Sequence, residues 1–344
     1  PTPTLRGAGA SPTPTTLVVP TPITPVTDGV FVSPTAGRMF MTRANVSQVT
    51  ELPRIFPPSQ NGIVGVDFSP DGRYIPVADN RGSVHLYDFI TLRTGDSTPV
   101  FSATIGTRTT WDVEFHPYRD QLMACNSDST LMVLNFAGRV LASADTPNSL
   151  TQCNYSRDGE ILAVAGNSVV VFYQLTQNDG FALIETRTGF DEPGINDVIF
   201  SHDNTILYTA GDNRFTAWNI ETGNEIWSVD VGNTWSINPL PNGNLITTGS
   251  SSRVELYNPR GTRITSFVGH DNDVIESAYN PSGELFITGS WDNNLRFWNA
   301  NGENTQILHT VNHGEYIVDI GWSRDGALVA TVGNNGVLIL WGIP

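Results

Sequence analysis

Apolar and polar residues alternate in short runs along the chain from Ile63 to the C-terminus. Each run has the length of a β-strand, and turn sequences such as Ser69-Pro70-Asp71-Gly72 separate the runs. A period of two predicts strands, and the Asp-Gly pairs supply residues that tolerate the positive φ of hairpin turns. The pattern therefore predicts an all-β protein with almost no helix.

The runs repeat as a unit of about 40 residues, which is the period of a four-stranded propeller blade. In each unit a first strand ends at a mostly aromatic position, which we call the anchor. A second strand ends in small residues, and a third again ends in a mostly aromatic position. The anchors are Phe68, Phe115, Tyr155, Phe200, Pro239, Tyr279 and Trp322, and the third strands end at Tyr87, Leu134, Tyr173, Trp218, Tyr257, Trp298 and Trp341. The repeat predicts a seven-bladed β-propeller of four-stranded antiparallel blades, with blades starting near residues 63, 110, 150, 195, 234, 274 and 317.

The sixth copy carries the family resemblance. Its Gly269-His270 pair, its Thr288-Gly289-Ser290-Trp291-Asp292 run and its Phe297-Trp298-Asn299 end closely resemble a WD repeat. In that family a His, a Ser or Thr, an Asp and a Trp of one blade form a hydrogen-bonded tetrad. The resemblance assigns these positions to His270, Thr288, Asp292 and Trp298. A buried imidazole between a carboxylate and a hydroxyl has its donor and acceptor satisfied, so we expect a structural rather than catalytic tetrad.

The other copies match the WD pattern less closely. The seventh copy keeps His313 and Trp341 but has Asn335 at the Asp position, and Asp128 and Asp212 stand in copies without the preceding Gly-His pair. The segment from Ala217 to Trp227 is similar to a blade of quinone-dependent dehydrogenase propellers, but it occurs once, whereas those enzymes repeat it. We therefore expect complete tetrads to be rare and an enzyme to be the less favoured alternative.

The last copy stops at Pro344, directly after its third strand, so its blade lacks an outer strand. An open ring would expose a strand edge and the faces of two blades. We expect the segment Ser47–Arg54 to supply the missing strand, with Val49 and Leu52 pointing inward. The stretch from Asn45 to Leu52 is similar to the lead-in of many bacterial WD-repeat propellers, which suggests a bacterial member of the family.

The N-terminal residues 1–36 have a different composition from the propeller domain, which we expect over residues 37–344. Residues 1–27 contain seven Pro and eight Thr, a composition that favours extended chain and forms no core. A spacer or stalk and a segment that docks on another subunit both fit this tail. Because the chain begins at Pro1, a cleaved secretory signal or another missing N-terminal piece that tethers the protein to a membrane is one explanation. On this basis we expect an extracytoplasmic location, either secreted or at the cell surface.

Charge and motif content argue against several functions. The net charge is −16, and all 18 basic residues are Arg, so nucleic acid is a poor partner for this chain. No apolar run reaches the roughly 20 residues that span a bilayer. Phosphate loops, nucleophile elbows and clustered metal ligands are absent from the sequence, so we expect no catalytic residue, no metal and no cofactor. The two cysteines, Cys125 and Cys153, are expected either as buried thiols or as a bridge between neighbouring blades.

Candidate binding residues lie where first strands start and where second and third strands connect, positions that share one rim in WD-repeat propellers. Apolar or small residues stand five and two positions before each anchor, and this spacing predicts a bulge that turns the residue four before the anchor toward the rim or the channel. Exposed aromatic side chains on a rigid rim are typical of binding hot spots, although packing between blades also uses aromatics. The candidate rim residues are Trp111, Trp235, Trp291, Tyr316 and Asp273.

These observations favour a non-enzymatic protein–protein interaction module, or an accessory subunit of a multi-protein complex, tethered or docked by its N-terminal tail. The acidic surface suits a basic partner better than an acidic one. The alternative is a propeller hydrolase or oxidoreductase that holds a metal or cofactor in its central channel.

Overall fold

A computed structural model describes residues 38–56, 61–146, 149–176, 180–188 and 194–344. The expected tail at residues 1–36 lies outside this part of the chain, so its role as a spacer or docking segment stays a prediction. Almost all regular structure in the described residues is β-strand. The helical elements are the 3₁₀ turn η1 (Val46–Gln48) and the short helix α1 (Phe89–Arg93), whose N-cap Asp88 accepts a hydrogen bond from the N–H of Ile90.

The strands form five four-stranded sheets and one eight-stranded sheet. The first two four-stranded sheets are β2–β5 (Ile63–Val66, Tyr74–Asp79, Ser83–Asp88, Phe101–Thr104) and β6–β9 (Thr110–Phe115, Gln121–Asn126, Thr130–Asn135, Val140–Asp145). The next two are β10–β13 (Gln152–Tyr155, Ile161–Gly166, Val169–Leu175, Phe181–Thr188) and β14–β17 (Ile195–Phe200, Ile206–Gly211, Arg214–Asn219, Glu225–Asp230). The fifth consists of β26, β27, β28 and β1 (Ile317–Trp322, Leu328–Gly333, Leu338–Gly342, Thr50–Ile55). The eight-stranded sheet contains β18–β21 (Thr234–Pro239, Leu245–Gly249, Arg253–Tyr257, Arg263–Val268) and β22–β25 (Val274–Tyr279, Leu285–Ser290, Asn294–Asn299, His309–Asn312).

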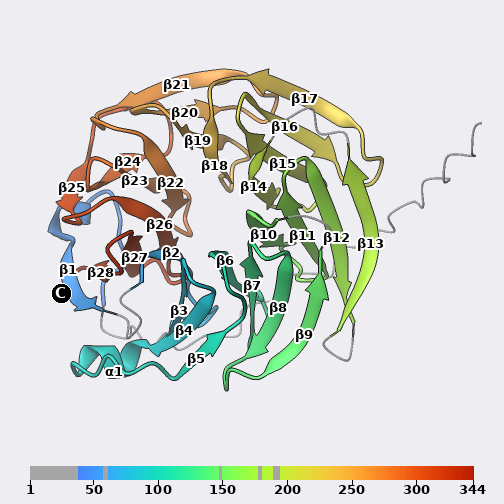
Figure 1. The fold of residues 1–344 in the computed structure, drawn as a ribbon. Coiled ribbons are helices and arrows are strands. Elements are labelled where there is room, and N and C mark those ends of the chain that lie inside the picture. The colour runs from blue at the N-terminus through green and yellow to red at the C-terminus, as the bar shows by residue number, and fades with distance from the viewer. Residues whose placement is uncertain (1–37, 57–60, 147–148, 177–179, 189–193) are drawn as a thin grey trace, which may run out of the picture.

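The sheets are arranged as a propeller around a common centre (Figure 1). The strands β2, β6, β10, β14, β18, β22 and β26 lie innermost, and strands such as β9, β13, β17 and β21 form the outside of the ring. Neighbouring strands within each sheet pair antiparallel. This arrangement confirms the predicted all-β propeller with antiparallel four-stranded blades. In the eight-stranded sheet, the single residue pair Gly249 and Val274 connects β19 to β22.

The core lies between successive sheets rather than inside any one of them. One buried cluster, for example, combines Ala78 and Val84 of the β2–β5 sheet with Val113 and Phe115 of β6. Each sheet therefore buries its faces only against its two neighbours, and a ring without a gap is needed to cover every face.

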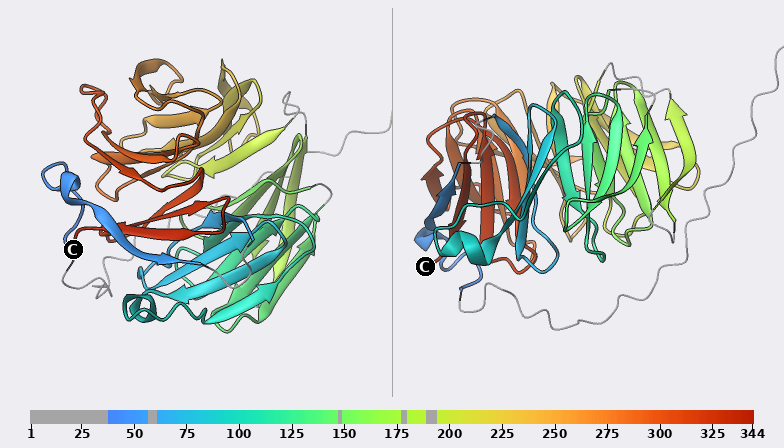
Figure 2. Two further views of the ribbon diagram at one scale, coloured as in Figure 1. Left: turned by 60° about the vertical axis from the view of Figure 1, so that its left-hand side comes forward. Right: turned by 60° about the horizontal axis from the view of Figure 1, so that its bottom comes forward.

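The N-terminal strand β1 completes the last sheet. It pairs antiparallel with β28, so that the sheet order is β1-β28-β27-β26 (Figure 2). The expected bounds Ser47–Arg54 were wrong, because the strand runs from Thr50 to Ile55. Residues 46–48 form the turn η1 instead, which the N–H of Val49 closes by donating to the carbonyl of Val46. Val49, which lies between the turn and the strand, is buried as expected.

The predicted bulge occurs in the innermost strands. The pairing of β2, β6, β14, β18, β22 and β26 with the next strand shifts register between the residues five and three before the anchor. In β6, for example, Thr110 pairs with Asn126 and Asp112 with Cys125, and Trp111 between them has no partner. The bulge therefore frees the residue four before the anchor to face the centre of the ring.

Candidate binding site in the central cavity

The innermost strands of all the sheets line one central cavity of about 1280 Å³. The residues four before the anchors all contribute to its wall, as the bulge predicts: Val64, Trp111, Thr151, Asn196, Trp235, Ile275 and Val318. Three turns between second and third strands add Asn80, Trp291 and Asn334 at the same end. We call this end the upper end of the cavity, and the end at the anchors the lower end.

Four of the five candidate rim residues line this cavity. Trp111, Trp291 and Tyr316 are exposed, with 43%, 36% and 46% of their surface accessible, and Trp235 is half-buried. The rings of Trp291 and Tyr316 lie 6.1 Å apart between centroids. We call these four residues the aromatic mouth.

Asp273 is half-buried and is not part of the cavity wall. Its carbonyl accepts a hydrogen bond from the N–H of Trp291 at 3.0 Å, which fixes the turn that carries this tryptophan. Its role in the structure is therefore to support one residue of the aromatic mouth.

Below the aromatic mouth the wall carries a ring of carboxyl groups that the sequence analysis missed. Three of these carboxyl groups belong to the residue three positions before an anchor. Each accepts a hydrogen bond from a backbone N–H of the next innermost strand, at the residue two positions before that strand's anchor. Asp112 accepts from Cys153 at 3.2 Å, Asp197 from Ile237 at 2.8 Å, and Asp319 from Val66 at 2.7 Å. The last of these bonds joins the final sheet to the first.

A second tier stands one residue before the anchors and repeats the arrangement lower in the cavity. In this tier the side chain accepts a hydrogen bond from the backbone N–H of the anchor residue in the next sheet. Asp67 accepts from Phe115 at 2.8 Å, Glu114 from Tyr155 at 3.0 Å, and Asn154 from Phe200 at 3.2 Å. Each side chain thus links two neighbouring sheets at the centre of the ring, which is a structural role.

Strands β18–β21 carry neutral side chains at these positions. Asn238 donates to the carbonyl of Ser277 at 2.9 Å, and the Ser236 hydroxyl donates to Glu276. Glu276 is the sixth carboxyl group in the cavity wall, after Asp67, Asp112, Glu114, Asp197 and Asp319.

Burial makes these carboxyl groups hard to ionise. It raises the pKa of Asp67 and Asp197 to about 6 and that of Asp319 to about 7. Burial and repulsion between the carboxylates hold the pKa of Asp112, Glu114 and Glu276 well above the usual range. The cavity therefore concentrates acidic groups that would gain from a nearby positive charge.

The lower end of the cavity is crossed by contacts between distant parts of the ring. Arg157 donates to the hydroxyl of Tyr279 at 2.9 Å, and that hydroxyl also contacts Nε2 of His202 at 3.2 Å. Arg324 donates to the carbonyl of Pro117 at 3.1 Å. These contacts place two guanidinium groups opposite the aromatic mouth.

The described residues contain no group of three or more His, Cys, Asp or Glu arranged to hold a metal ion. The carboxyl groups of the cavity instead accept backbone N–H groups. This geometry gives no support to a metal centre in the described part of the cavity.

The four predicted tetrad residues, from strands β23 and β24, the turn between them and the loop before β22, are joined by hydrogen bonds. Trp298 donates from Nε1 to the Thr288 hydroxyl at 2.8 Å, and this hydroxyl contacts Nε2 of His270 at 2.7 Å. The other ring nitrogen of His270, Nδ1, lies 2.9 Å from Oδ2 of Asp292. In the β26–β28 strands the Trp341–Thr331 pair repeats the first link at 2.8 Å.

Arg296 is a fifth member of this network that the sequence analysis did not assign. Its Nη1 donates to Oδ2 of Asp292 at 2.5 Å. Burial lowers the pKa of His270 to about 4, so the imidazole is neutral at neutral pH. Although burial alone would raise the pKa of Asp292, hydrogen bonds from the Asp271 N–H, His270 and Arg296 lower it to about 2. The network therefore holds a neutral imidazole beside an ionised carboxylate paired with a guanidinium.

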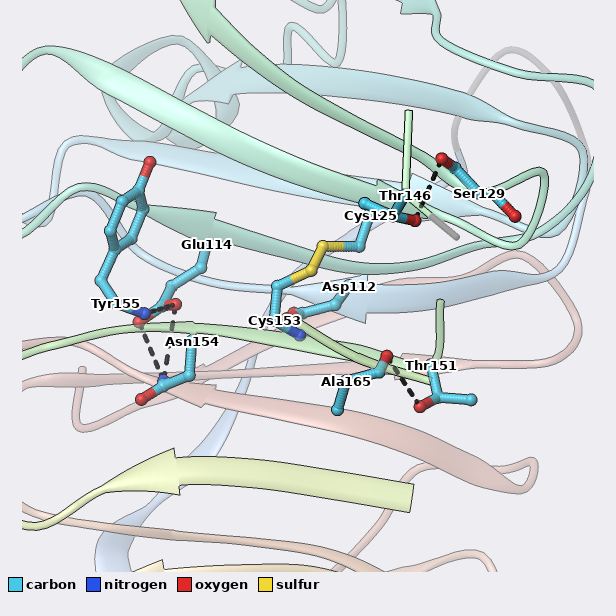
Figure 3. The surroundings of a disulfide bond; sticks show 10 residues. All are labelled: Asp112, Glu114, Cys125, Ser129, Thr146, Thr151, Cys153, Asn154, Tyr155 and Ala165. Carbon is cyan, nitrogen blue, oxygen red and sulfur yellow. Dashed lines mark hydrogen bonds between the residues drawn. A yellow bond between two sulfur atoms is a disulfide. The ribbon is translucent and has the colours of Figure 1, made fainter. Parts of the chain in front are cut away.

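The two cysteines form a disulfide bond between neighbouring sheets (Figure 3). Cys125 lies on β7 and Cys153 on β10, and both are fully buried. The structure thus selects the bridge over the alternative of two buried thiols. The bridge lies directly beside the hydrogen bond from the Cys153 N–H to Asp112, so two links join these sheets at one point.

Comparison with known families finds the "WD domain, G-beta repeat" in three segments, residues 182–219, 261–299 and 305–342. The second segment contains the whole His270 network. The third contains His313 and the Thr331–Trp341 pair.

Several eukaryotic proteins are similar to this chain. "Ribosome biogenesis protein YTM1" of Phaeosphaeria nodorum is 26% identical over 73% of this chain and 57% of its own length. "B-type cell cycle switch protein ccs52B" of Medicago truncatula is 24% identical over 76% of this chain and 54% of its own length. "Anaphase-promoting complex subunit cdh1" of Dictyostelium discoideum is 34% identical over 32% of this chain and 16% of its own length. The chain thus spans about half the length of the first two relatives.

These relatives correct two expectations. The bacterial type is not supported, because the relatives are eukaryotic WD-repeat proteins. The extracytoplasmic location was wrong, because the relatives are named for ribosome biogenesis and the cell cycle, which take place inside the cell. Nothing in the comparisons supports a membrane tether, and no helix among the described residues is long and apolar enough to cross a bilayer.

The matched repeats, the His270 network and the ring of antiparallel four-stranded blades agree with one another. Together they support the WD-repeat family for this chain, which contains WD40 repeats in an all-β propeller.

Proposed function

We propose that this protein is a non-enzymatic protein–protein interaction module that docks a partner at the aromatic mouth. The observation that supports it most directly is the set of four large aromatic side chains around one cavity opening. Three of them are exposed on a rigid ring, where they bury much area at little cost in side-chain entropy. The names of the relatives, which describe a ribosome biogenesis protein and a complex subunit, agree with a role in assemblies.

We also propose that the ring has seven blades, because β18–β21 and β22–β25 each repeat the four-strand order and share only one residue pair. The innermost strands would then mark the blades, and residues 37–344 would form the propeller domain. The structural role proposed for His270, Thr288, Asp292 and Trp298 fits this division, since all four lie within one blade.

Affinity purification with rim variants tests the docking surface. A variant with Trp111, Trp291 and Tyr316 replaced by Ala should lose partners that the wild-type protein retains. The matched control replaces Leu183 and Ile264, which are exposed apolar residues on the outer strands β13 and β21, with Ala. Retention of every partner by the triple rim variant, with its fold intact, would rule out docking at the mouth.

The alternative of a hydrolase or oxidoreductase makes a different prediction. An enzyme of that kind would keep a stoichiometric metal or cofactor through gel filtration. Metal analysis of the purified full-length chain would therefore separate the two functions.

A further inference from the structure

The charges in the cavity wall are separated along its axis. Acidic side chains occupy the middle, directly under the aromatic mouth. Among the described residues of the wall, the arginines are Arg157 and Arg324, and both lie at the lower end, where they donate to Tyr279 and Pro117. A positive group that enters from the upper end meets aromatic faces first and carboxyl groups next.

Part of this acidic wall is available to a ligand. Asp112 stands next to Trp111 in the same bulge and accepts the Cys153 N–H through Oδ2. Its other oxygen, Oδ1, makes no hydrogen bond with any residue that the structure describes. The aromatic face and the acceptor oxygen are therefore contributed by adjacent residues of one strand.

We propose that the aromatic mouth accepts an arginine side chain from a partner segment, with the guanidinium stacked on the aromatic rings and directed toward Asp112. This inference rests on the proposed docking function and names the chemistry of the partner. A guanidinium is planar, stacks on indole faces, donates five hydrogen bonds and is more weakly hydrated than an ammonium group. Those properties match a site built from three tryptophans, one tyrosine and buried carboxyl groups. The chain's charge of −16 also draws a basic segment toward it.

The electrostatics of the cavity agree with this occupant. A guanidinium among carboxyl groups favours their ionised form, so binding should release protons and strengthen as the pH rises from about 5 to 8. Apart from the tyrosines Tyr118, Tyr155, Tyr279 and Tyr316, the titratable and charged groups that face the cavity among the described residues are Asp67, Asp112, Glu114, Asp197, Glu276, Asp319, His202, Arg157 and Arg324. Burial lowers the pKa of His202 to about 4, so it stays neutral across that range.

Peptide binding to the full chain tests the proposal. The probe is a capped Gly-Gly-Arg-Gly-Gly peptide, and the matched control carries citrulline, which has the same shape without the charge. Titration calorimetry, with tryptophan fluorescence as a second readout, should give saturable binding of the arginine peptide at up to millimolar concentration. Binding of the citrulline peptide should be at least about tenfold weaker, the difference expected for one desolvated cation–π contact and one charged hydrogen bond.

Two variants place the site. Trp111→Ala and Asp112→Asn should each weaken binding of the arginine peptide at least about fivefold. Asn keeps an acceptor for the Cys153 N–H and cannot ionise, so the second variant should fold and should melt no lower than the wild type. Tyr118→Ala, at the lower end of the cavity, is the control and should bind normally.

Equal binding of the two peptides, no saturable binding, or normal binding by both Trp111→Ala and Asp112→Asn would overturn the proposal. The docking function is tested separately by the rim variants. If those variants lose partners while the arginine and citrulline peptides bind alike, docking at the mouth stands and the preference for arginine is refuted.

Discussion

At the residue scale, the network around His270 shows how a buried polar group stabilises one blade. The imidazole lies between the Thr288 hydroxyl and the Asp292 carboxylate, and Arg296 neutralises the carboxylate. Pairing most of these buried polar atoms reduces the cost of burying them, although Nε of Arg296 has no hydrogen-bond partner among the described residues. The network also links two segments of the blade, since Asp292 accepts the backbone N–H of Asp271 in the loop before β22.

Replacing His270 with Ala should destabilise the protein by about 1–3 kcal/mol, because Thr288 and Asp292 each lose a buried partner. The measurement is the free energy of unfolding in urea at pH 7. Glu303→Ala, an exposed change in the loop between β24 and β25, serves as the control and should lie within error of the wild type. A change at His270 no larger than that of the control would show that the observed hydrogen bonds contribute nothing to stability.

The sequence predicted some of these buried polar residues and not others. The tetrad could be predicted because the Gly269-His270 and Trp291-Asp292 spacings resemble a known repeat. Arg296 could not, because an arginine on a strand looks like any exposed charge until its partner is known. The carboxyl ring was missed because the copies differ at those positions, with Gly65, Gln152 and Ser236 standing where other copies have Asp or Glu.

At the element scale, the unpaired edge of β28 explains how the ring closes, and the bulges in the innermost strands explain which residues face the cavity. The spacing of apolar residues before the anchors predicted the bulge correctly, because an interrupted period of two is visible in a single strand. The disulfide could not be decided in this way, since Cys125 and Cys153 belong to different sheets. Only the packing of two neighbouring sheets brings their Cα atoms within 6.5 Å.

Deleting residues 1–55 tests the closing strand. The deletion exposes the edge of β28 and, among the residues that the structure describes, removes the buried side chains of Met41, Val46, Val49 and Ile55. At about 1.5–3 kcal/mol each, their loss approaches the whole stability of a typical domain. We expect the cooperative thermal transition to be lost or strongly lowered. Deleting only residues 1–27 keeps β1 and should preserve the melting temperature, so equal melting of both deletions would contradict closure by this strand.

At the scale of the whole molecule, the carboxyl ring exists only when the propeller is assembled. Asp67, Asp197 and Asp319 come from different sheets, and they repel one another because the ring brings them to a common centre. Each carboxyl gains a backbone donor from the next sheet and loses hydration. The same groups therefore link the sheets and resist ionisation, which makes the stability of the ring sensitive to pH.

Asp319→Asn should separate these two effects. The folded protein raises the pKa of Asp319 to about 7 from an ordinary value of 3.8, chiefly through burial. The folded state thus binds the proton more tightly, so the contribution of Asp319 to stability is present below about pH 4 and is lost as the pH rises through about 7. Asn cannot ionise and keeps an acceptor for the Val66 N–H, but it loses the acceptor for the Ile320 N–H at every pH. The melting temperature of the variant relative to the wild type should therefore be higher at pH 8 than at pH 5.

The two proteins are compared by thermal melts at both pH values, so that contributions shared by wild type and variant, such as those of the buried histidines, cancel. Each kcal/mol should shift the melting temperature by roughly 2–4 °C in a domain of this size. Asp230→Asn, an exposed change on β17, is the control and should show the same small difference at both pH values. If the difference in melting temperature between Asp319→Asn and the wild type is the same at pH 8 and at pH 5, ionisation of Asp319 does not destabilise the folded ring.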